Sequence, residues 1–246
     1  MHRVIADRIE DNSVILPEEE SHHLVRVLRS RPGDRFLAHD GRGTVYLCAL
    51  TRRPEGWAGE ILERLDPGTE SPLRVCLAQS LIKKDKFEWV VQKAVELGVK
   101  EIVPLLTWRT EVRPDEEGRE RKMRRWDKIA HEAFKQSART WLPEIREAQT
   151  LADFLARPAA DLRFVLDEEQ GIDLRELIRG RRVRTCELLV GPEGGWDERD
   201  RVTLKEHNVS SINLGRRVLR AETCPITVLS ILQYELGDLG PGRQKA

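Results

Sequence analysis

The stretch that decides the fold is LLVGPEGGW, residues 188–196. A short apolar run leads into three glycines and a proline, with one carboxylate, Glu193, among them. The next residues, DERDRVTLKEH, are typical of a helix, so the glycines fall where a strand passes into a helix. Open α/β sheets bind ligands at the carboxyl ends of their strands. Taken alone, the stretch is equally compatible with a tight turn and with a ligand-binding loop.

Two familiar phosphate-binding loops are excluded here. The stretch lacks both GxxxxGK[ST], the P-loop pattern, and GxGxxG, the dinucleotide-binding pattern.

Around this stretch, apolar runs alternate with helical patterns from Leu73 onward. The runs are LRVCLAQSL, EIVPLL, LRFVL, CELLVG and SINL. Such alternation predicts an α/β domain with a mainly parallel sheet covered by helices. One helix is expected over residues 84–98, with Gly98 as its stop, a second over 119–140, and a last one from about Pro225 to 236. The residues expected to face the core of the first two are Phe87, Val90, Val91, Ala94, Val95, Met123, Trp126, Ala130, Ala133, Phe134 and Ser137.

The first 65 residues have a different rhythm. Short β-like runs, SVIL, RFLAHD and TVYLCAL, are broken by the turn sequences RPGD and DGRG. This spacing predicts a small β-barrel or sandwich. The segment LDPGTESPL, residues 65–73, is typical of a linker, so two domains are expected, over residues 1–70 and 73–246.

Composition narrows the class of protein. The 42 Lys and Arg cancel the 42 Asp and Glu, so net charge does not indicate a nucleic-acid partner. No apolar run approaches the ~20 residues of a membrane-spanning helix, and a cytoplasmic protein is expected. The four cysteines lie far apart, without CxxC pairs, which favours reduced thiols over a disulfide framework or a metal site.

A second segment, SINLGRRVLRAETCP at residues 210–225, repeats the strand-then-glycine pattern. Its turn at Leu214–Gly215 is followed by Arg216, Arg217 and Arg220, and then by Glu222. These could be surface charges, and the next residue, a threonine, could be a helix cap. Two glycine turns at strand ends of one parallel sheet nevertheless favour a paired binding site.

The motifs GPEGGW, LGRRVLRAET and YELGDLG, in this order, resemble the ribosomal small-subunit methyltransferase E family. ESHHLVRVLRSRPGD, LIKKDKFEWVVQKAVELGV and QSARTWLPEI extend the resemblance to essentially the whole chain. The resemblance implies a PUA-like β-barrel that binds RNA, followed by an α/β domain of the SPOUT class with a deep C-terminal trefoil knot. It also implies a homodimer that uses S-adenosyl-L-methionine to methylate N3 of a uridine in 16S rRNA of the small ribosomal subunit.

The family's cofactor loops match specific positions of this chain. Glycines there suit a ligand held by backbone groups, because without Cβ the backbone approaches closely. Arg216 and Cys224 depart from the family pattern, where proline and a small residue are expected. The cofactor-binding residues that the resemblance implies are Leu166, Leu189, Gly191, Pro192, Glu193, Gly194, Gly195, Leu214, Gly215, Val218, Leu219 and Thr223.

Two residues are candidates for catalysis. Uracil N3 carries a proton, so its methylation needs a base or a cation that stabilises the uracil anion. Arg220 is the candidate cation or phosphate anchor, since a guanidinium stays charged and presents several donors. Glu222 could be the base, but an arginine two residues away lowers a carboxyl pKa, and a structural role at the helix start is the alternative.

RNA contacts are expected from both domains. For the histidines among them, a packing or capping role is equally open. Residues 119–140 carry eight basic and three acidic residues, against ten and twelve over residues 1–66, so the second domain is expected to bind phosphates. The expected RNA-contacting residues are His22, His23, Arg26, Arg29, Lys83, Lys84, Lys86, Lys93, Gln136 and Arg139.

Three rival functions stay open. A nucleotide-dependent enzyme would use the Gly191 loop for phosphate, although the P-loop lysine is missing. A non-catalytic RNA-binding protein would keep the barrel and a degenerate knot. Another SPOUT methyltransferase would act on a different RNA.

Overall fold

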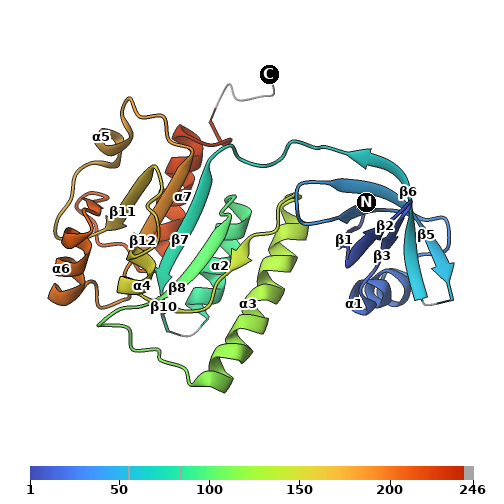
Figure 1. Ribbon diagram of the computed structural model, residues 1–246, viewed down its shortest axis with the longest axis horizontal. Helices are drawn as coiled ribbons and strands as arrows, with labels where there is room; N and C mark the ends of the chain where they lie inside the picture. Colours follow the sequence, from blue (N-terminus) through green and yellow to red (C-terminus); the bar gives the residue numbers. More distant parts are fainter. Residues whose placement is uncertain (55, 84, 241–246) are drawn as a thin grey trace. The chain divides into compact units, whose positions relative to one another are not determined.

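The computed structural model describes residues 1–54, 56–83 and 85–240 of the chain (Figure 1). These residues form two compact units. The first contains Met1–Glu70 and Phe134–Leu142, and the second contains Ser71–Ala133 and the chain from Pro143 onward. The return of Phe134–Leu142 to the first unit is not visible in the sequence pattern.

The first unit is built on one six-stranded sheet. Its order is β1-β4-β5-β6-β3-β2, and all neighbours are antiparallel except the parallel pair β1–β4. Alternate residues such as Phe36 and Ala38 are buried, as expected for strands with one face on a core. The strands are β1 (Arg3–Ile5), β2 (Arg8–Glu10), β3 (Ser13–Ile15), β4 (Arg35–His39), β5 (Val45–Arg53) and β6 (Gly56–Leu65), accompanied by α1 (Glu18–His22) and the π-helix η1 (His23–Val27).

The second unit has a seven-stranded sheet in which every pairing is parallel. The order is β10-β8-β7-β12-β11-β13, with β9 beside β8. This confirms the predicted parallel sheet, and strands β7, β8, β11, β12 and β13 fall on the predicted apolar runs. The strands are β7 (Arg74–Ser80), β8 (Glu101–Leu106), β9 (Glu144–Ile145), β10 (Gln149–Thr150), β11 (Leu162–Leu166), β12 (Thr185–Val190) and β13 (Ser210–Ile212).

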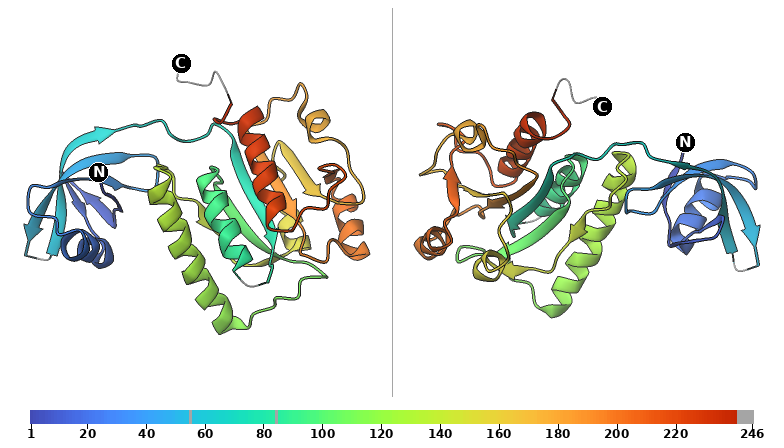
Figure 2. Two further views of the ribbon diagram at one scale, coloured as in Figure 1. Left: turned by 180° about the vertical axis from the view of Figure 1, so that it is seen from behind. Right: turned by 45° about the horizontal axis from the view of Figure 1, so that its top comes forward.

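Helices cover both faces of this sheet. On one face, α7 (Thr223–Glu235) lies beside α2 (Lys86–Glu96) and against β12 (Figure 2). On the other face, α4 (Leu151–Leu155) and α6 (Glu198–Glu206) pack on a core that includes Ala78, Val103 and Leu189. The remaining helices are α3 (Glu116–Gln136) and α5 (Leu174–Ile178).

The predicted helices are present, but the end predicted for the second one is wrong. All five predicted core residues of α2 are at most 2% exposed, and Gly98 ends that helix with φ +81°. Helix α3 ends at Gln136, so the predicted end at residue 140 is wrong. The reason is Ala138, whose φ of +56° is outside the helical region. Met123 and Ser137 are half-buried, whereas the other four predicted core residues of α3 are buried.

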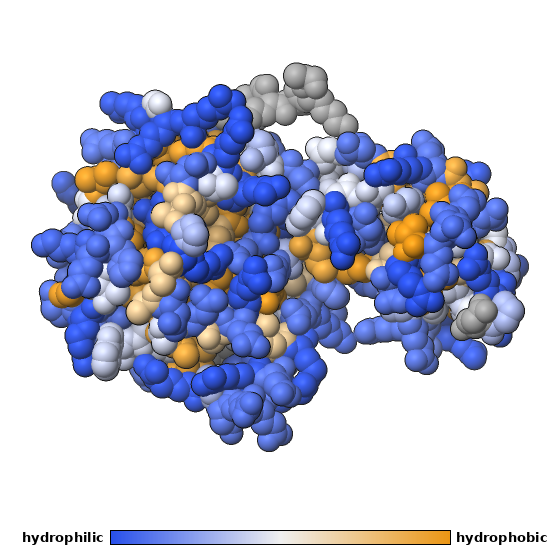
Figure 3. Space-filling model, viewed as in Figure 1, coloured by the Kyte–Doolittle hydropathy of each residue, from blue (hydrophilic) through white to orange (hydrophobic). Residues whose placement is uncertain are grey.

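The surface and the cysteines fit a folded domain with reduced thiols. Hydrophilic residues cover most of the molecular face in Figure 3. Cys48, Cys76 and Cys186 are buried, Cys224 is half-buried, and all four are free thiols.

Among the described residues, no helix has the length and apolarity needed to cross a membrane. The same residues contain no cluster of three His, Cys, Asp or Glu side chains placed to hold a metal ion.

Candidate functional site

A cavity of about 670 Å³ lies at the carboxyl ends of β11, β12 and β13. Residues from 166–168, 190–196 and 212–221 supply most of its lining. Three side chains come from helices, namely Lys86, Arg201 and Cys224. The parallel sheet is the cause of this convergence, because it brings the ends of neighbouring strands to one edge.

The structure therefore brings the two glycine turns of the sequence into one site. Arg220, the candidate cation, lines the same cavity. The predicted cofactor residues that line it are Leu166, Gly191, Pro192, Glu193, Gly195, Leu214, Gly215, Val218 and Leu219.

Three predicted cofactor residues lie outside this lining. Leu189 is fully buried in the core under α4 and α6, because successive strand side chains point to opposite faces. Gly194 turns its carbonyl oxygen away to Arg109, whose Nη1 donates to it at 2.8 Å. Thr223 is the first residue of α7, and its backbone N–H donates to the Arg220 carbonyl at 2.8 Å.

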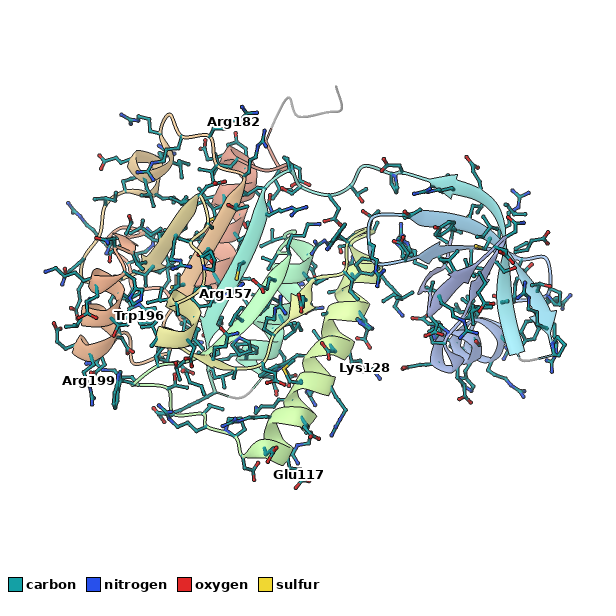
Figure 4. All side chains as sticks on the ribbon, viewed as in Figure 1. Glu117, Lys128, Arg157, Arg182, Trp196 and Arg199 are labelled. Carbon is teal, nitrogen blue, oxygen red and sulfur yellow. The ribbon has the colours of Figure 1, made fainter. Side chains whose placement is uncertain are left out.

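The loop over residues 191–196, here called the glycine-rich loop, is held in place by Trp196 and Glu193. Trp196 is 3% exposed, and its indole N–H donates to the Leu166 carbonyl at 2.8 Å. In Figure 4 this side chain lies between α6 and the sheet. A Cβ on Gly191 would lie 3.1 Å from the indole, a tight contact that would press on the ring, so glycine suits this position. The Glu193 carboxylate accepts the Lys83 backbone N–H at 3.0 Å, which orients the loop.

The second loop, residues 214–220, is here called the arginine loop, and Asn213 anchors its start. The Asn213 side-chain amide donates to the carbonyls of Glu168 at 2.8 Å and Asp167 at 3.2 Å. Its oxygen accepts the Gly215 N–H at 2.7 Å. Sequence reasoning missed Asp167, Glu168 and Asn213, although each is among the first polar residues after a strand at the ligand-binding edge.

Charged pairs set the electrostatics of the cavity. Arg201 forms an ion pair with Asp167 and a second with Glu169 at 3.1 Å. The Lys86 ammonium lies 3.1 Å from the Glu222 carboxylate, whose side chain is 14% exposed.

Glu222 is ionised at neutral pH. Burial raises its pKa. A backbone hydrogen bond and the Lys86 ammonium lower the pKa by a larger amount, so the net shift is downward. A carboxylate with a lowered pKa is a weak proton acceptor at neutral pH. Burial also raises the pKa of the Cys224 thiol to about 11, so that thiol stays protonated.

The RNA-contact candidates of the first unit are exposed. His22 ends α1, and η1 begins at His23 and buries only Leu24, so His22, His23, Arg26 and Arg29 face solvent. Arg139 is different, since it is 4% exposed and its guanidinium donates to the Glu70 carboxylate at 2.9 Å. A phosphate contact from Arg139 therefore requires this pair to open.

The lysine candidates on α2 and just before it are engaged in ion pairs. Lys83 contacts Glu111 at 2.6 Å, and Lys93 contacts Glu96 at 2.8 Å. Gln136 is exposed at the end of α3, and Lys84 lies outside the described residues. The excess positive charge predicted over residues 119–140 is partly neutralised in the same way, because Arg125 pairs with Glu88 and Lys135 with Glu20.

Comparison with known proteins places this site in a family. A family model described as an RNA methyltransferase domain matches residues 69–233, and one described as an RNA methyltransferase PUA domain matches residues 16–55. The ribosomal RNA small subunit methyltransferase E of Bacillus subtilis is 32% identical over 225 residues, which are 88% of each chain. The chain belongs to the ribosomal RNA small subunit methyltransferase E family. The Synechocystis member is 32% identical over 234 residues, 92% of this chain and 75% of that one.

Solved structures agree with this assignment. The Neisseria gonorrhoeae family member bound to S-adenosyl methionine superposes with a TM-score of 0.87 at 29% identity, covering 97% of this chain and 99% of that one. A Legionella pneumophila protein in complex with the same cofactor has a TM-score of 0.88 at 31% identity, covering 96% and 98%. The fold is thus an N-terminal PUA domain joined to an α/β methyltransferase domain.

Proposed function

We propose that the protein transfers a methyl group from S-adenosyl-L-methionine to N3 of a specific uridine in 16S rRNA. The observation that carries this proposal is the cavity at the ends of β11, β12 and β13, built from two glycine turns in a chain of the methyltransferase E family. Structural neighbours that bind the same cofactor support it.

The proposal includes an architecture for this function. Residues 1–70 act as the PUA-like RNA-binding domain and residues 73–246 as the SPOUT methyltransferase domain with its C-terminal trefoil knot. The enzyme is a homodimer in the cytoplasm and acts on the small ribosomal subunit or its 16S rRNA. The parallel sheet and the family membership support this assignment.

The cavity fits the proposed cofactor in size and chemistry. Its volume of about 670 Å³ lies within the range of roughly 300–1,000 Å³ that small-molecule sites occupy. Leu166, Leu214 and Leu219 provide apolar walls, and the glycines expose backbone donors and acceptors. The lining carries both anionic and cationic side chains, so it offers partners for the cationic and for the anionic groups of the cofactor. The anionic ones are Asp167, Glu168 and Glu193, and the cationic ones are Lys86, Arg201, Arg216, Arg217 and Arg220. We assign the predicted cofactor-binding residues in the lining to this role, and Leu189, Gly194 and Thr223 to supporting it.

The bound cofactor would supply an electrophilic methyl group. The chain's own contribution is to hold the two loops so that the acceptor nitrogen meets that group in line. Arg220 is 81% exposed beside the cavity, where it can anchor a phosphate or stabilise the uracil anion. Glu222, with its lowered pKa, pairs with Lys86 at the residue before α7, which favours its structural role over that of a base.

RNA binding is assigned to exposed groups of the first domain and to lysines of the second. Lys83, Lys86 and Lys93 must leave their carboxylate partners to contact a phosphate. His22, His23, Arg26 and Arg29 serve the first domain, and Gln136 lies at the end of α3. Lys83, Lys84, Lys86 and Lys93 contribute positive charge on the second domain. Binding by phosphate contacts should weaken steeply as salt rises, and a flat salt dependence would contradict it.

Two measurements test the function. Isothermal titration should show binding of S-adenosylmethionine and none of ATP, and the reverse would favour the nucleotide-dependent enzyme. Purified protein should then methylate small subunits from cells that lack it, and mass mapping should find N3-methyluridine in 16S rRNA. Binding without methyl transfer would favour a non-catalytic RNA-binding protein, and a methylated base in another RNA would favour a different SPOUT specificity.

A further inference from the structure

Residues 107–113, between β8 and α3, contact the glycine-rich loop from a segment that does not line the cavity. Arg109 makes the contact. Its Nη1 donates to the Gly194 carbonyl at 2.8 Å, and its Nε lies 3.6 Å from the Asp197 carboxylate. The neighbours of Gly194 on both sides, Glu193 and Gly195, line the cavity.

The segment that carries Arg109 is itself fixed. Thr107 and Thr110 are 2% and 4% exposed, and the Thr107 N–H donates to the Thr110 hydroxyl at 2.9 Å. The Arg113 Nη2 donates to the Thr107 carbonyl at 2.9 Å, and the Trp108 N–H donates to the Asp200 carboxylate at 3.3 Å. Arg109 therefore extends from a segment that is itself held in place, and its hydrogen bond can restrain a more flexible partner.

The glycine-rich loop is such a partner. Gly195 has φ +68°, and a glycine backbone has more conformations available than any other. A site that binds its ligand through backbone groups requires each peptide plane to be fixed before the ligand arrives, since ordering it later costs affinity. The Arg109 hydrogen bond fixes one side of the peptide plane between Gly194 and Gly195, and the Gly195 N–H, which donates to the Pro192 carbonyl at 3.0 Å, fixes the other.

We propose that Arg109 is a positioning residue of the methyl-donor site, which sets cofactor affinity through the Gly194 carbonyl without touching the cofactor. This inference rests on the proposed function. It gives Arg109, which lies outside the cavity, a role in binding the methyl donor and no role in recognising RNA.

Arg109→Gln tests the proposal, with Arg119→Gln as the control. Both changes remove an exposed guanidinium that donates to a backbone carbonyl, but Arg119 donates to Pro114, outside the segment that carries Arg109. Calorimetry with S-adenosylmethionine and with S-adenosylhomocysteine should show Kd rising about tenfold for Arg109→Gln and less than about twofold for the control. KM for the methyl donor should rise by the same factor, while kcat and KM for the ribosomal substrate stay within about twofold.

Arg109→Lys keeps the charge and one donor, and should recover affinity to within about threefold of the unsubstituted protein. Equal affinity of Arg109→Gln and the unsubstituted protein would overturn the inference. So would an equal loss in Arg119→Gln, or a loss confined to KM for RNA. If the unsubstituted protein binds no S-adenosylmethionine, the proposed function fails first, and that measurement needs no variant.

Discussion

The glycine-rich loop and the arginine loop form two sides of one cavity and are built in opposite ways. The first is closed by a tryptophan that is 3% exposed, and Lys83 and Arg109 hydrogen-bond to it from other segments. The second presents Val218, 77% exposed, and Arg220, 81% exposed. In the proposed function, the first is the methyl-donor side, formed during folding, and the second is the open side that meets the RNA. Substitutions in the first should therefore cost stability, and those in the second should cost turnover.

The largest expected loss of stability is at Trp196. Trp196→Ala removes a buried indole and leaves the Leu166 carbonyl without its donor, so the free energy of unfolding should fall by about 3–5 kcal/mol. Trp196→Phe keeps most of the ring and loses the N–H, which should cost about 1–3 kcal/mol. Urea unfolding followed by circular dichroism measures both.

Trp89→Phe is the control for these changes, because Trp89 is 41% exposed on α2. Its stability should change by less than about 0.5 kcal/mol. A neutral Trp196→Phe would show that the indole hydrogen bond does not hold the glycine-rich loop.

The next largest effect is expected at Gly171, which underlies the start of the arginine loop. Its φ is +146°, and an added Cβ would lie 2.5 Å from the backbone carbon of Ile212 and 2.7 Å from the nitrogen of Asn213. Gly171→Ala combines backbone strain with a clash against backbone, and should cost about 3 kcal/mol and weaken cofactor binding.

Gly180→Ala separates the effect of backbone strain from that of the clash. Gly180 has φ +70° with nothing within 4 Å of the added Cβ, so strain alone should cost about 1 kcal/mol. Thermal melts and cofactor titrations of both variants make the test. Equal losses of stability and of cofactor affinity in the two variants would mean that the contact between Gly171 and Ile212 does not shape the site.

A smaller effect, with a defined pH dependence, is expected from Glu222. Its pKa is lowered in the folded protein from the ordinary 4.5, so its contribution to stability is full above about pH 4.5 and is lost as pH falls through the lowered value. Glu222→Gln should cost about 1 kcal/mol at neutral pH, and this difference should shrink below about pH 4.5.

The same variant tests the catalytic role of Glu222. If Glu222 has only a structural role, the pH dependence of turnover from neutral pH to below about pH 4.5 should be the same in Glu222→Gln and in the unsubstituted enzyme. Disappearance of an acidic limb in the variant would instead identify Glu222 as the base.

Sequence reasoning predicted what depends on local pattern. The apolar runs located five strands of the parallel sheet, and the two glycine turns located the cavity. It could not predict that Arg139 is buried against Glu70, because that pair joins residues 69 positions apart. Leu189 was assigned to the cofactor by motif position, although the alternation of side chains along β12 directs it to the core.

The end of α3 also depends on contacts that a local sequence pattern does not show. Its helical periodicity continues past Gln136, yet Ala138 adopts a positive φ, and Phe134–Leu142 belongs to the first unit. Alanine favours helices on its own, so tertiary contacts override its propensity here. Asn213 was missed for a related reason. Two of its three hydrogen bonds, those to the Asp167 and Glu168 carbonyls, depend on the path of the chain after β11, and only the bond from Gly215 is local in sequence.

The smallest change in stability is expected on the open side of the cavity. Arg220→Ala and Val218→Ser should each leave the free energy of unfolding within about 0.5 kcal/mol, because both side chains are mostly exposed. Turnover of Arg220→Ala should nevertheless fall at least tenfold at saturating S-adenosylmethionine, since a charge that acts on the RNA or on the uracil anion contributes mainly in the transition state. Paired urea-unfolding and methyl-transfer assays separate the two quantities. A stable Arg220→Ala with near-normal turnover would remove Arg220 from catalysis, and an unstable one would mean that the arginine loop is built like the glycine-rich loop.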